Sequence, residues 1–504
     1  MKKLLNIVFS KTIVVGILIA LQVYWLFLLF AALKEHAVWL ESALGFLALV
    51  MFLAVIISEQ NPAYKIGWIV LISVVPLLGG LLYLVMSNKK PSGRLRMKIK
   101  NAEMNIQKQL KDIKYPEPQI EERMKSMSNY IAKNGNYPIH SGTKVDYFKV
   151  GEDMFASMMK DLKEAKEFIF FEYFIVGEGK MWQEMKSVLI EKAKQGVDVR
   201  VMYDDLGCVG VLPPRIQQEL RENGVQVVAF NPLVPFLALV MNNRDHRKIL
   251  VIDGDIGYNG GINIADEYIN INPPYGHWKD TGLRLEGEGV ANLTTMFLSL
   301  WNAYYPESGT VEKYLPKKRV EDAVGYVQSF SDSPLDDELI AENVYMDILW
   351  QAKDYVYIFT PYLIIDHEMT VALTMAAKRG VDVRLVVPKI PDKKTVYHLT
   401  ESYFKPLVEQ GVKIYLYTPG FIHAKSYISD DRVAVVGTIN MDYRSLYLHF
   451  ECGTVLIEHP AIMDLKADCF ETFAVSEQVE VARLNKGRLF NMYQAVLRVL
   501  SPLF

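Results

Sequence analysis

The same spaced motif occurs twice in this chain, and the repeat limits the possible fold more than any other feature of the sequence. The first copy consists of His246, Lys248, Asp253, Gly260 and Asn263. The second copy has identical spacing and consists of His423, Lys425, Asp430, Gly437 and Asn440. Histidine is scarce, with nine in 504 residues, so a match in identical register indicates two homologous halves.

The residues around each motif predict a β-strand. DHRKILVIDG and HAKSYISDD are mostly β-branched or apolar and are bounded by turn formers. Side chains at positions i and i+2 share one face of a strand, so each motif histidine should lie beside the lysine that follows it. An imidazole beside a fixed ammonium group suits an anionic oxygen ligand such as phosphate.

Each motif continues into a glycine segment, NGGIN at 259–263 and VGTIN at 436–440. Glycine lets the backbone come close to a ligand, and the asparagine that ends each segment offers amide donors. Asp253 and Asp430 should anchor the turn into these segments. If the halves pair by pseudo-twofold symmetry, two histidines, two lysines and two asparagines surround one centre.

The repeat extends beyond the motifs. Three further pairs of predicted strands match between the halves: 167–176 with 355–364, 196–205 with 380–389, and 224–230 with 411–417. In each half an apolar-periodic stretch between the first two strands predicts a crossover helix that ends at Gly196 or Gly380. The fold class is therefore α/β, with two homologous domains, each a largely parallel or mixed sheet flanked by helices. The two sheets should pack together and place both motifs at a shared cleft.

At this level of detail the sequence resembles the phospholipase D superfamily, whose signature is this duplicated HKD motif. The resemblance covers roughly residues 136–504. NNRDHRKILVIDG, GGINIADEY, WKDTGLRLEG, FIHAKSYISDDRVAVVGTINMDYRS and the terminal LSPLF look most like bacterial cardiolipin synthases.

The resemblance implies a set of catalytic residues and their roles. That set is His246, Lys248, Asp253, His423, Lys425 and Asp430, of which we expect the two aspartates to be structural. A neutral imidazole attacks phosphorus and a protonated one supplies a proton to the departing alkoxide, after which the acid becomes the base. Family analogy assigns attack to His246 and acid–base catalysis to His423, a choice that the symmetry of the sequence does not make.

Further residues match family positions that bind phosphate or orient the histidines. The implied phosphate-binding residues are Asn263, Asn440, Gly261 and Thr438. Of the last two, only Thr438 has a hydroxyl. In the family an acidic residue downstream of each motif orients the histidine, and the matching residues are Asp280 in WKDT and Glu451 in HFEC. The histidines outside the motifs, His449 among them, have no motif partner and should be ordinary surface or hydrogen-bonded residues, with His277 worth comparing with the site because it is close to Asp280.

The N-terminal region predicts a membrane anchor. The chain is 51% hydrophobic, and the excess gathers in residues 12–33 and 66–86, each near the length that spans a bilayer, with a shorter run at 43–58. We therefore expect transmembrane helices in residues 1–88, a basic polar linker at 89–135, and two domains at 136–320 and 321–504.

Charge and cysteine content predict where the catalytic domains lie. Basic residues gather after the last apolar run, which favours two or three spans and a cytoplasmic catalytic part. The resemblance implies that the membrane is a bacterial cell membrane. The three cysteines show no metal-type spacing and no even disulfide set, which suits a reducing compartment.

The reaction implied by the resemblance is transfer of a phosphatidyl group from one phosphatidylglycerol to another, giving cardiolipin and glycerol. Phosphatidylglycerol, cardiolipin and the membrane are then the partners, with no cofactor and no metal. The alternatives are a phospholipase D, another phosphatidyltransferase such as a phosphatidylserine synthase, or an inactive membrane scaffold. A net charge of −3 disfavours a nuclease and nucleic-acid binding.

Overall fold

The computed structural model describes residues 21, 24–25, 37–86, 93–113, 117–232, 243–306, 310–336, 338–484 and 486–501. The chain divides into two compact units. The smaller unit comprises residues 1–89, 233–242 and 492–504, and the larger comprises residues 90–232 and 243–491. Both motifs therefore belong to the larger unit.

The smaller unit contains three packed helices, α3 (Ala37–Ile57), α4 (Pro62–Val74) and α5 (Pro76–Met86). The predicted apolar run 66–86 is not one helix, because Pro76 has no backbone N–H to donate and divides it into α4 and α5. The run 43–58 lies almost wholly in α3, whereas 12–33 falls outside the described residues except at 21, 24 and 25. Among the helices that the structure describes, none combines the length and apolar character needed to cross a membrane.

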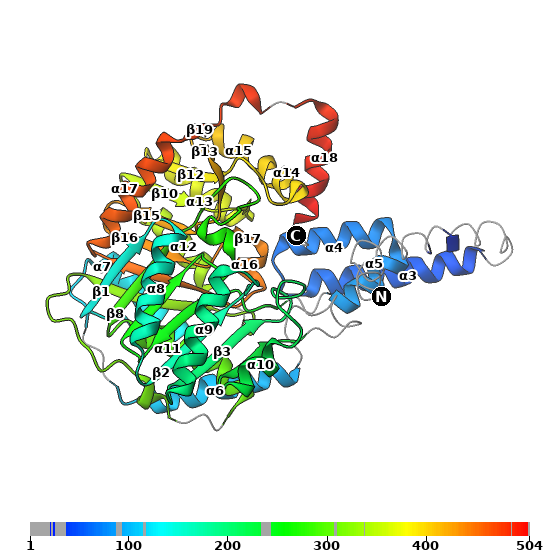
Figure 1. The fold of residues 1–504 in the computed structure, drawn as a ribbon. Helices are drawn as coiled ribbons and strands as arrows, with labels where there is room; N and C mark the ends of the chain where they lie inside the picture. The colour runs from blue at the N-terminus through cyan, green and yellow to red at the C-terminus, as the bar shows by residue number, and fades with distance from the viewer. Residues whose placement is uncertain are drawn as a thin grey trace. The chain divides into compact units, whose positions relative to one another are not determined.

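The larger unit contains two mixed β-sheets with the same strand order (Figure 1). The first has the order β1-β8-β6-β5-β2-β3-β4, with β1 Thr143–Phe148, β2 Phe168–Tyr173, β3 Asp198–Asp204, β4 Gln226–Phe230, β5 Lys248–Ile252, β6 Ile256–Gly260 and β8 Gly282–Gly287. The second has the order β9-β18-β16-β15-β10-β12-β13-β19, with β9 Tyr326–Asp332, β10 Tyr355–Phe359, β12 Asp382–Pro388, β13 Lys413–Tyr417, β15 Ser426–Ser429, β16 Val433–Gly437, β18 Glu451–Ile457 and β19 Ser476–Gln478. Strand for strand, the first seven of the second sheet repeat the first sheet, and β19 is an added edge strand.

Strand direction follows the sequence pattern. In the first sheet β2, β3 and β4 are parallel, while β5, β6 and β8 pair antiparallel. All six residues of β2 are buried, which explains its unbroken apolar run, since a strand covered on both faces needs no polar alternation. The predicted α/β class is confirmed.

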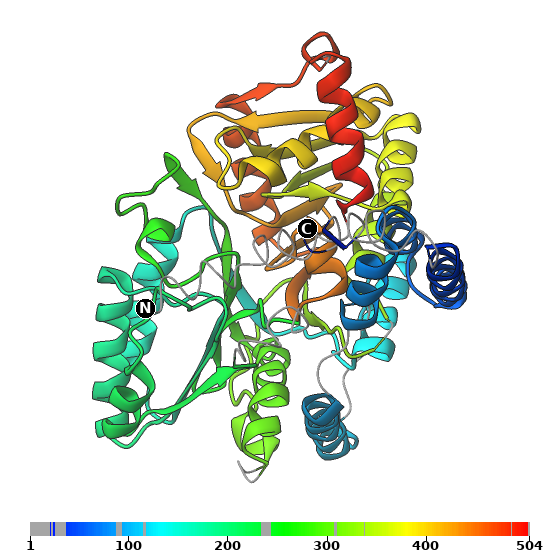
Figure 2. The same ribbon diagram turned by 90° about the vertical axis from the view of Figure 1, so that its right-hand side faces the viewer.

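Helices cover the sheets and complete the core. They are α6 Gly93–Leu110, α7 Glu122–Tyr130, α8 Gly151–Glu164, α9 Lys180–Lys194, α10 Ile216–Glu222, α11 Val290–Tyr304, α12 Ile340–Gln351, α13 His367–Lys378, α14 Lys394–Ser402, α15 Phe404–Val408, α16 Tyr443–Tyr447 and α17 Ala461–Ala474, with shorter turns at Ile131–Gly135, Asp266–Ile269, Val311–Tyr314 and Val481–Arg483. Helix α18 (Arg488–Val499) begins in the larger unit and belongs to the smaller unit from residue 492. The predicted crossover helices are α9 and α13. Helices α8 and α9 pack on one face of the first sheet, and α11 packs on the other, where its apolar side chains join a core shared with the second sheet (Figure 2).

Two short pairings connect the halves close to the motifs. Strand β14 (Gly420–Ile422) pairs in parallel with β7 (His277–Lys279), and Asp245 forms a parallel bridge with Phe450. Within the second half, β11 (Leu363–Ile364) pairs with β17 (Met441–Asp442). The first two pairings join the residues just before each motif histidine to the residues just before an acidic residue of the other half.

Candidate active site

Each motif histidine is held by backbone hydrogen bonds to the opposite half of the chain. The amide of His246 donates to the carbonyl of Phe450 at 2.9 Å, and the amide of His423 donates to the carbonyl of Lys279 at 2.7 Å. Phe450 and Lys279 directly precede Glu451 and Asp280. The backbone therefore brings each histidine to a carboxylate that lies far away in the sequence.

The side chains complete this crossed arrangement. Nδ1 of His246 lies 2.8 and 2.9 Å from the two carboxylate oxygens of Glu451, and Nδ1 of His423 lies 2.7 Å from Oδ2 of Asp280. Both carboxylates are fully buried. A carboxylate that accepts from Nδ1–H leaves Nε2 as the free nitrogen, so each pair presents Nε2 for chemistry. The sequence named both acids, but the exchange between halves was visible only in the structure.

The motif lysines lie against the backbone of their own histidines. Nζ of Lys248 donates to the carbonyl of His246 at 2.6 Å, and Nζ of Lys425 donates to the carbonyl of His423 and lies 2.7 Å from its Nδ1. The predicted neighbours at i and i+2 are thus together. They occupy the extended segments that lead into the strands, because β5 begins at Lys248 and β15 only at Ser426.

Burial makes all four basic groups hard to protonate. It lowers the pKa of Lys248 to about 8 and the pKa of Lys425 to about 7. Burial and then Lys425 lower the pKa of His423 to about 4, although Asp280 acts in the opposite direction. Burial, Lys248 and His449 lower the pKa of His246 well below its ordinary value. An anionic ligand that binds beside these buried basic groups would favour their charged forms, so the site is suited to a ligand that brings negative charge.

The two carboxylates differ in their electrostatics. Burial disfavours charge on Asp280, but His423 and Lys425 outweigh it and lower the pKa of that carboxyl group. Burial raises the pKa of Glu451 well above its ordinary value, even though Lys248 and Thr438 act in the opposite direction. The pseudo-symmetric halves are therefore chemically unequal at the histidines.

The side chains of the motif aspartates accept hydrogen bonds from backbone amides and do not contribute to the cleft. The carboxylate of Asp253 accepts from the amides of Lys166, Glu167 and Phe168 at 2.7–3.0 Å, and Asp430 does the same for residues 353–355. Both aspartates have positive φ, 54° and 53°. They fix the turns that precede β2 and β10, at the far end of each motif strand from the lysine.

The glycine-segment residues have unequal contacts. Asn263 is satisfied on both sides, since its Oδ1 accepts from the amide of Ile175 at 3.1 Å and its Nδ2 donates to the hydroxyl of Tyr268 at 2.7 Å. Oδ1 of Asn440 is buried with no hydrogen-bond partner within the described part of the chain. The hydroxyl of Thr438 donates to Glu451, so it contacts the histidine-orienting acid. A Cβ at Gly261 would lie 2.0 Å from Oδ1 of Asp280, so this position needs glycine for close approach.

His449 is the residue near the site that the sequence reading missed. It was expected to be an ordinary residue, yet its ring centroid lies 5.7 Å from that of His246. His246, His449 and Glu451 place donor atoms within 4.8 Å of one another. Because Nδ1 of His246 already bonds both oxygens of Glu451, we assign this group to hydrogen bonding and not to a metal. The available signal was position, since His449 precedes Glu451 by two residues as Trp278 precedes Asp280.

His277 does not join the site. Its Nδ1 lies 2.9 Å from the hydroxyl of Tyr417, and its backbone takes part in the β7–β14 pairing. The next residue, Trp278, does contact the site, because its ring centroid lies 5.7 Å from that of His423.

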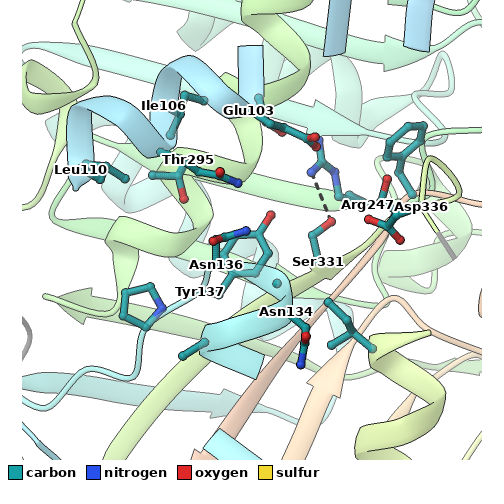
Figure 3. Close-up of a pocket in the computed structure, with 18 of the residues that line it drawn as sticks. Glu103, Ile106, Leu110, Asn134, Asn136, Tyr137, Arg247, Thr295, Ser331 and Asp336 are labelled. Atoms are coloured by element: carbon teal, nitrogen blue, oxygen red, sulfur yellow. Dashed lines mark hydrogen bonds between the residues drawn. The ribbon is translucent and has the colours of Figure 1, made fainter. Parts of the chain in front are cut away.

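A cavity of about 560 Å³ lies behind the first motif (Figure 3). Arg247, between the motif histidine and lysine, lines it together with Ser331 and Glu103. Nε of Arg247 donates to Glu172 at 2.7 Å, and burial raises the pKa of Glu103 to about 7. Side chains alternate along an extended segment, so Arg247 points away from the lysine–histidine side and anchors the motif from its other face.

Comparison with known proteins agrees with this geometry. The family model described as "Cardiolipin synthase, PLD-like domain" matches residues 158–301 and 345–473, and the model "Phospholipase_D-nuclease N-terminal" matches residues 46–87. An uncharacterised protein of Streptococcus mutans is 44% identical over 88% of this chain and 98% of its own length. A cardiolipin synthase of Geobacillus sp. (strain WCH70) is 36% identical over 92% of this chain and 95% of its own length.

Among solved structures, the phosphatidylserine synthase of Haemophilus influenzae Rd KW20 shares the fold, with a TM-score of 0.56 and 14% identity over 74% of this chain and 96% of that chain. The family matches cover both motif-bearing halves and the apolar N-terminal region. The chain belongs to the cardiolipin synthase family, with its two phospholipase D-like halves.

Proposed function

We propose that this chain transfers a phosphatidyl group from one phosphatidylglycerol molecule to another and so produces cardiolipin and glycerol. The observation that carries the proposal is the pair of crossed contacts, His246 with Glu451 and His423 with Asp280. Two oriented imidazoles with two buried lysines provide a nucleophile, an acid and a positive environment for one phosphodiester. The names of the relatives supply the lipid substrate class.

In the first step Nε2 of His246 attacks phosphorus. A P–N bond forms, the P–O bond to the glycerol headgroup breaks, and His423 gives its Nε2 proton to the departing oxygen. The phosphatidyl group is then held on His246. Lys248, Lys425, Asn263 and Asn440 are the candidates that bind the non-bridging oxygens, where negative charge accumulates in the transition state.

In the second step the primary hydroxyl of another phosphatidylglycerol attacks the same phosphorus. His423 removes the proton of that hydroxyl, the new P–O bond forms, and the P–N bond breaks. One phosphodiester replaces another, so no nucleotide is consumed. Water is the competing acceptor and would yield phosphatidic acid.

The electrostatic difference between the halves supports His246 as the nucleophile. Asp280 opposes the lowering of the pKa of His423, whereas the largest influences on His246 are burial, Lys248 and His449, and these lower its pKa. His246 is therefore the more firmly neutral imidazole, and His423 is the one that a bound anionic phosphate can most easily leave protonated. This agrees with the roles that family analogy assigns.

The proposal includes membrane attachment. Residues 1–88 serve as the anchor, residues 89–135 as the linker, and 136–320 and 321–504 as the two catalytic domains, on the cytoplasmic side of a bacterial cell membrane. Support comes from the apolar runs of the sequence and the basic residues that follow them. Attachment keeps the lipid alcohol concentrated near the site and limits access of water.

The experiment is to incubate the full chain in mixed micelles with phosphatidylglycerol alone and to separate the lipids. Cardiolipin together with an equal amount of glycerol supports the proposal. Phosphatidic acid in place of cardiolipin identifies a phospholipase D. In a parallel incubation with added serine, phosphatidylserine in place of cardiolipin identifies a phosphatidylserine synthase. Absence of any turnover from a folded, lipid-bound protein indicates a scaffold.

A further inference from the structure

Corresponding positions in the two halves carry different rings over the catalytic histidines. Trp278 lies over His423 with a centroid distance of 5.7 Å and an interplanar angle of 39°, and His449 lies over His246 at 5.7 Å and 43°. Each ring comes two residues before the acid that binds the histidine. The two halves therefore place an aromatic side chain at the same position beside the catalytic histidine, but this side chain is an indole in one half and an imidazole in the other.

The two acids also differ in their hydrogen-bond partners. In Asp280, Oδ2 faces His423 and Oδ1 accepts from the amide of Thr281 at 2.8 Å. The corresponding amide in the second half, that of Cys452, donates instead to the hydroxyl of Thr438 at 3.0 Å. Glu451 thus lacks the backbone donor that its counterpart has.

His449 stands where it can supply the missing donor. Its Nδ1 lies 4.0 Å from Oε1 of Glu451, and its side chain is 10% exposed. Both of its ring nitrogens are buried and have no hydrogen-bond partner within the described residues. A buried imidazole without partners is costly. A hydrogen bond from Nδ1 to Oε1 requires the two atoms to come closer by about 1 Å.

We propose that His449 is a positioning residue that donates a hydrogen bond to Oε1 of Glu451 and thereby keeps His246 in the nucleophilic tautomer. While it is ionised, Glu451 can only accept, so it holds the proton of His246 on Nδ1 and leaves Nε2 free. If Glu451 takes up a proton, its O–H can donate to Nδ1; the His246 proton then lies on Nε2, and the nitrogen that attacks phosphorus is blocked. The inference rests on the proposed function, because it assigns His246 the attack.

Several charged groups surround Glu451 and act with or against this donor. Lys248 and the hydroxyls of Thr438 and Ser445 favour the charged carboxylate, while burial and Asp442 disfavour it. His246 is the direct partner. Removing the His449 donor shifts this balance towards the protonated carboxyl group, so the variant should need a higher pH before Glu451 ionises.

The test compares His449→Phe, which keeps a ring without a donor, with His449→Asn, which keeps an N–H donor. For each enzyme, glycerol release from phosphatidylglycerol micelles is measured from pH 5 to 8 in the presence of EDTA. We expect the acid limb of the profile to move up by about one pH unit in His449→Phe and to return towards the wild-type position in His449→Asn. At pH 6 this corresponds to roughly a tenfold difference between the two variants.

Trp278→Phe is the matched control, because it removes the ring donor from the other half. Its acid limb, normalised to its own maximum, should stay at the wild-type position. An unmoved limb in His449→Phe, or equal shifts in the Phe and Asn variants, would overturn the inference. A purely structural role for His449 would lower the melting temperature without moving the limb.

A second measurement does not depend on the Phe variant folding. In ¹⁵N-histidine-labelled wild-type protein, the resonance that disappears in His246→Ala should show a protonated Nδ1 and an unprotonated Nε2 at pH 7, and His449→Asn should preserve this pattern. The opposite tautomer in the wild type contradicts the inference. If the wild-type protein releases no glycerol, the proposed function is wrong. If it releases glycerol but the acid limb does not move in His449→Phe, only the role of His449 is wrong.

Discussion

Nδ1 of His246 lies 2.8 Å from Oε1 of Glu451, an acid contributed by the other half of the chain. The relationship is reciprocal, since His423 binds Asp280 from the first half. Because the four residues form two pairs with different electrostatics, substitutions in the two pairs should have distinguishable effects on the two steps of transfer.

Replacing either catalytic histidine should remove cardiolipin formation. We expect His246→Ala and His423→Ala each to reduce the rate by at least about 10³-fold, because one removes the nucleophile and the other the acid and base. After incubation with radiolabelled phosphatidylglycerol and rapid acid-free quenching, label should remain on His423→Ala protein and not on His246→Ala protein. Label on His246→Ala alone would exchange the two roles.

The orienting acids should affect different steps. Glu451→Gln should slow the first release of glycerol by about 10²-fold, because the amide lacks the carboxylate charge and its NH2 group can donate to Nδ1, which favours the other tautomer. Asp280→Asn should instead slow acid and base transfer by His423. Pre-steady-state measurement of glycerol release distinguishes the two variants. The Glu451→Gln enzyme should show no burst of glycerol, because its first step is slow. The Asp280→Asn enzyme should keep part of the burst, because its step with the acceptor alcohol is also slow. Identical kinetics in both variants would contradict unequal roles.

The buried lysines predict a decline in activity at alkaline pH. Lys425 and Lys248 have pKa values near 7 and 8 in the free protein because burial disfavours their charge. As pH rises from 7 to 9 they lose the charge that binds phosphate, so kcat/KM should fall by roughly 10- to 100-fold. Bound phosphate favours the charged lysines, so kcat at saturating lipid should decline less. Lys425→Arg should hold its charge through this range and weaken the decline, whatever its maximal rate.

The motif aspartates should matter for stability and not for chemistry. Asp253→Ala leaves three backbone amides without their acceptor and should lower the free energy of unfolding by about 1–3 kcal/mol. The same is expected of Asp430→Ala. Urea unfolding of the variants measures the loss, with Glu184→Ala as the control because that side chain is 44% exposed on α9. At a temperature where the variants are folded, a rate loss above tenfold would show that the aspartates also act in catalysis.

A methyl group at Gly261 should disturb the acid–base histidine. The added Cβ would lie 2.0 Å from Oδ1 of Asp280, so the carboxylate must move away from its place beside His423. We expect Gly261→Ala to lower kcat by about 10-fold or more. Gly93→Ala is the control, because its Cβ would meet nothing within 4 Å. A fully active Gly261→Ala enzyme would mean that Asp280 tolerates displacement.

Much of the fold followed from the repeat. The strand pairs 196–205 with 380–389 and 224–230 with 411–417 contain β3, β12, β4 and β13, because apolar β-branched runs bounded by glycine have few other solutions. The apolar run 66–86 forms two helices, α4 and α5, and hydrophobicity alone does not register the break at Pro76. The predicted domain boundaries and the number of membrane spans stay predictions.

The candidate site was harder to predict than the fold. His246, Lys248 and Asp280 were found by motif and resemblance, but their partners depend on two backbone bridges between residues far apart in sequence. The spacing of residues in the sequence does not indicate that His246 binds the acidic residue of the second half. The position of His449 near the site was missed for the same reason, because its contact with His246 depends on the fold and not on its place in the sequence.

The exchange of carboxylates also bears on how such a protein can be divided. A fragment with only the first half contains His246 without Glu451 and Asp280 without His423. A fragment with only the second half contains His423 without Asp280 and Glu451 without His246. Neither piece can do part of the chemistry, but the two pieces are complementary. Co-expressed halves should therefore regain activity only on association.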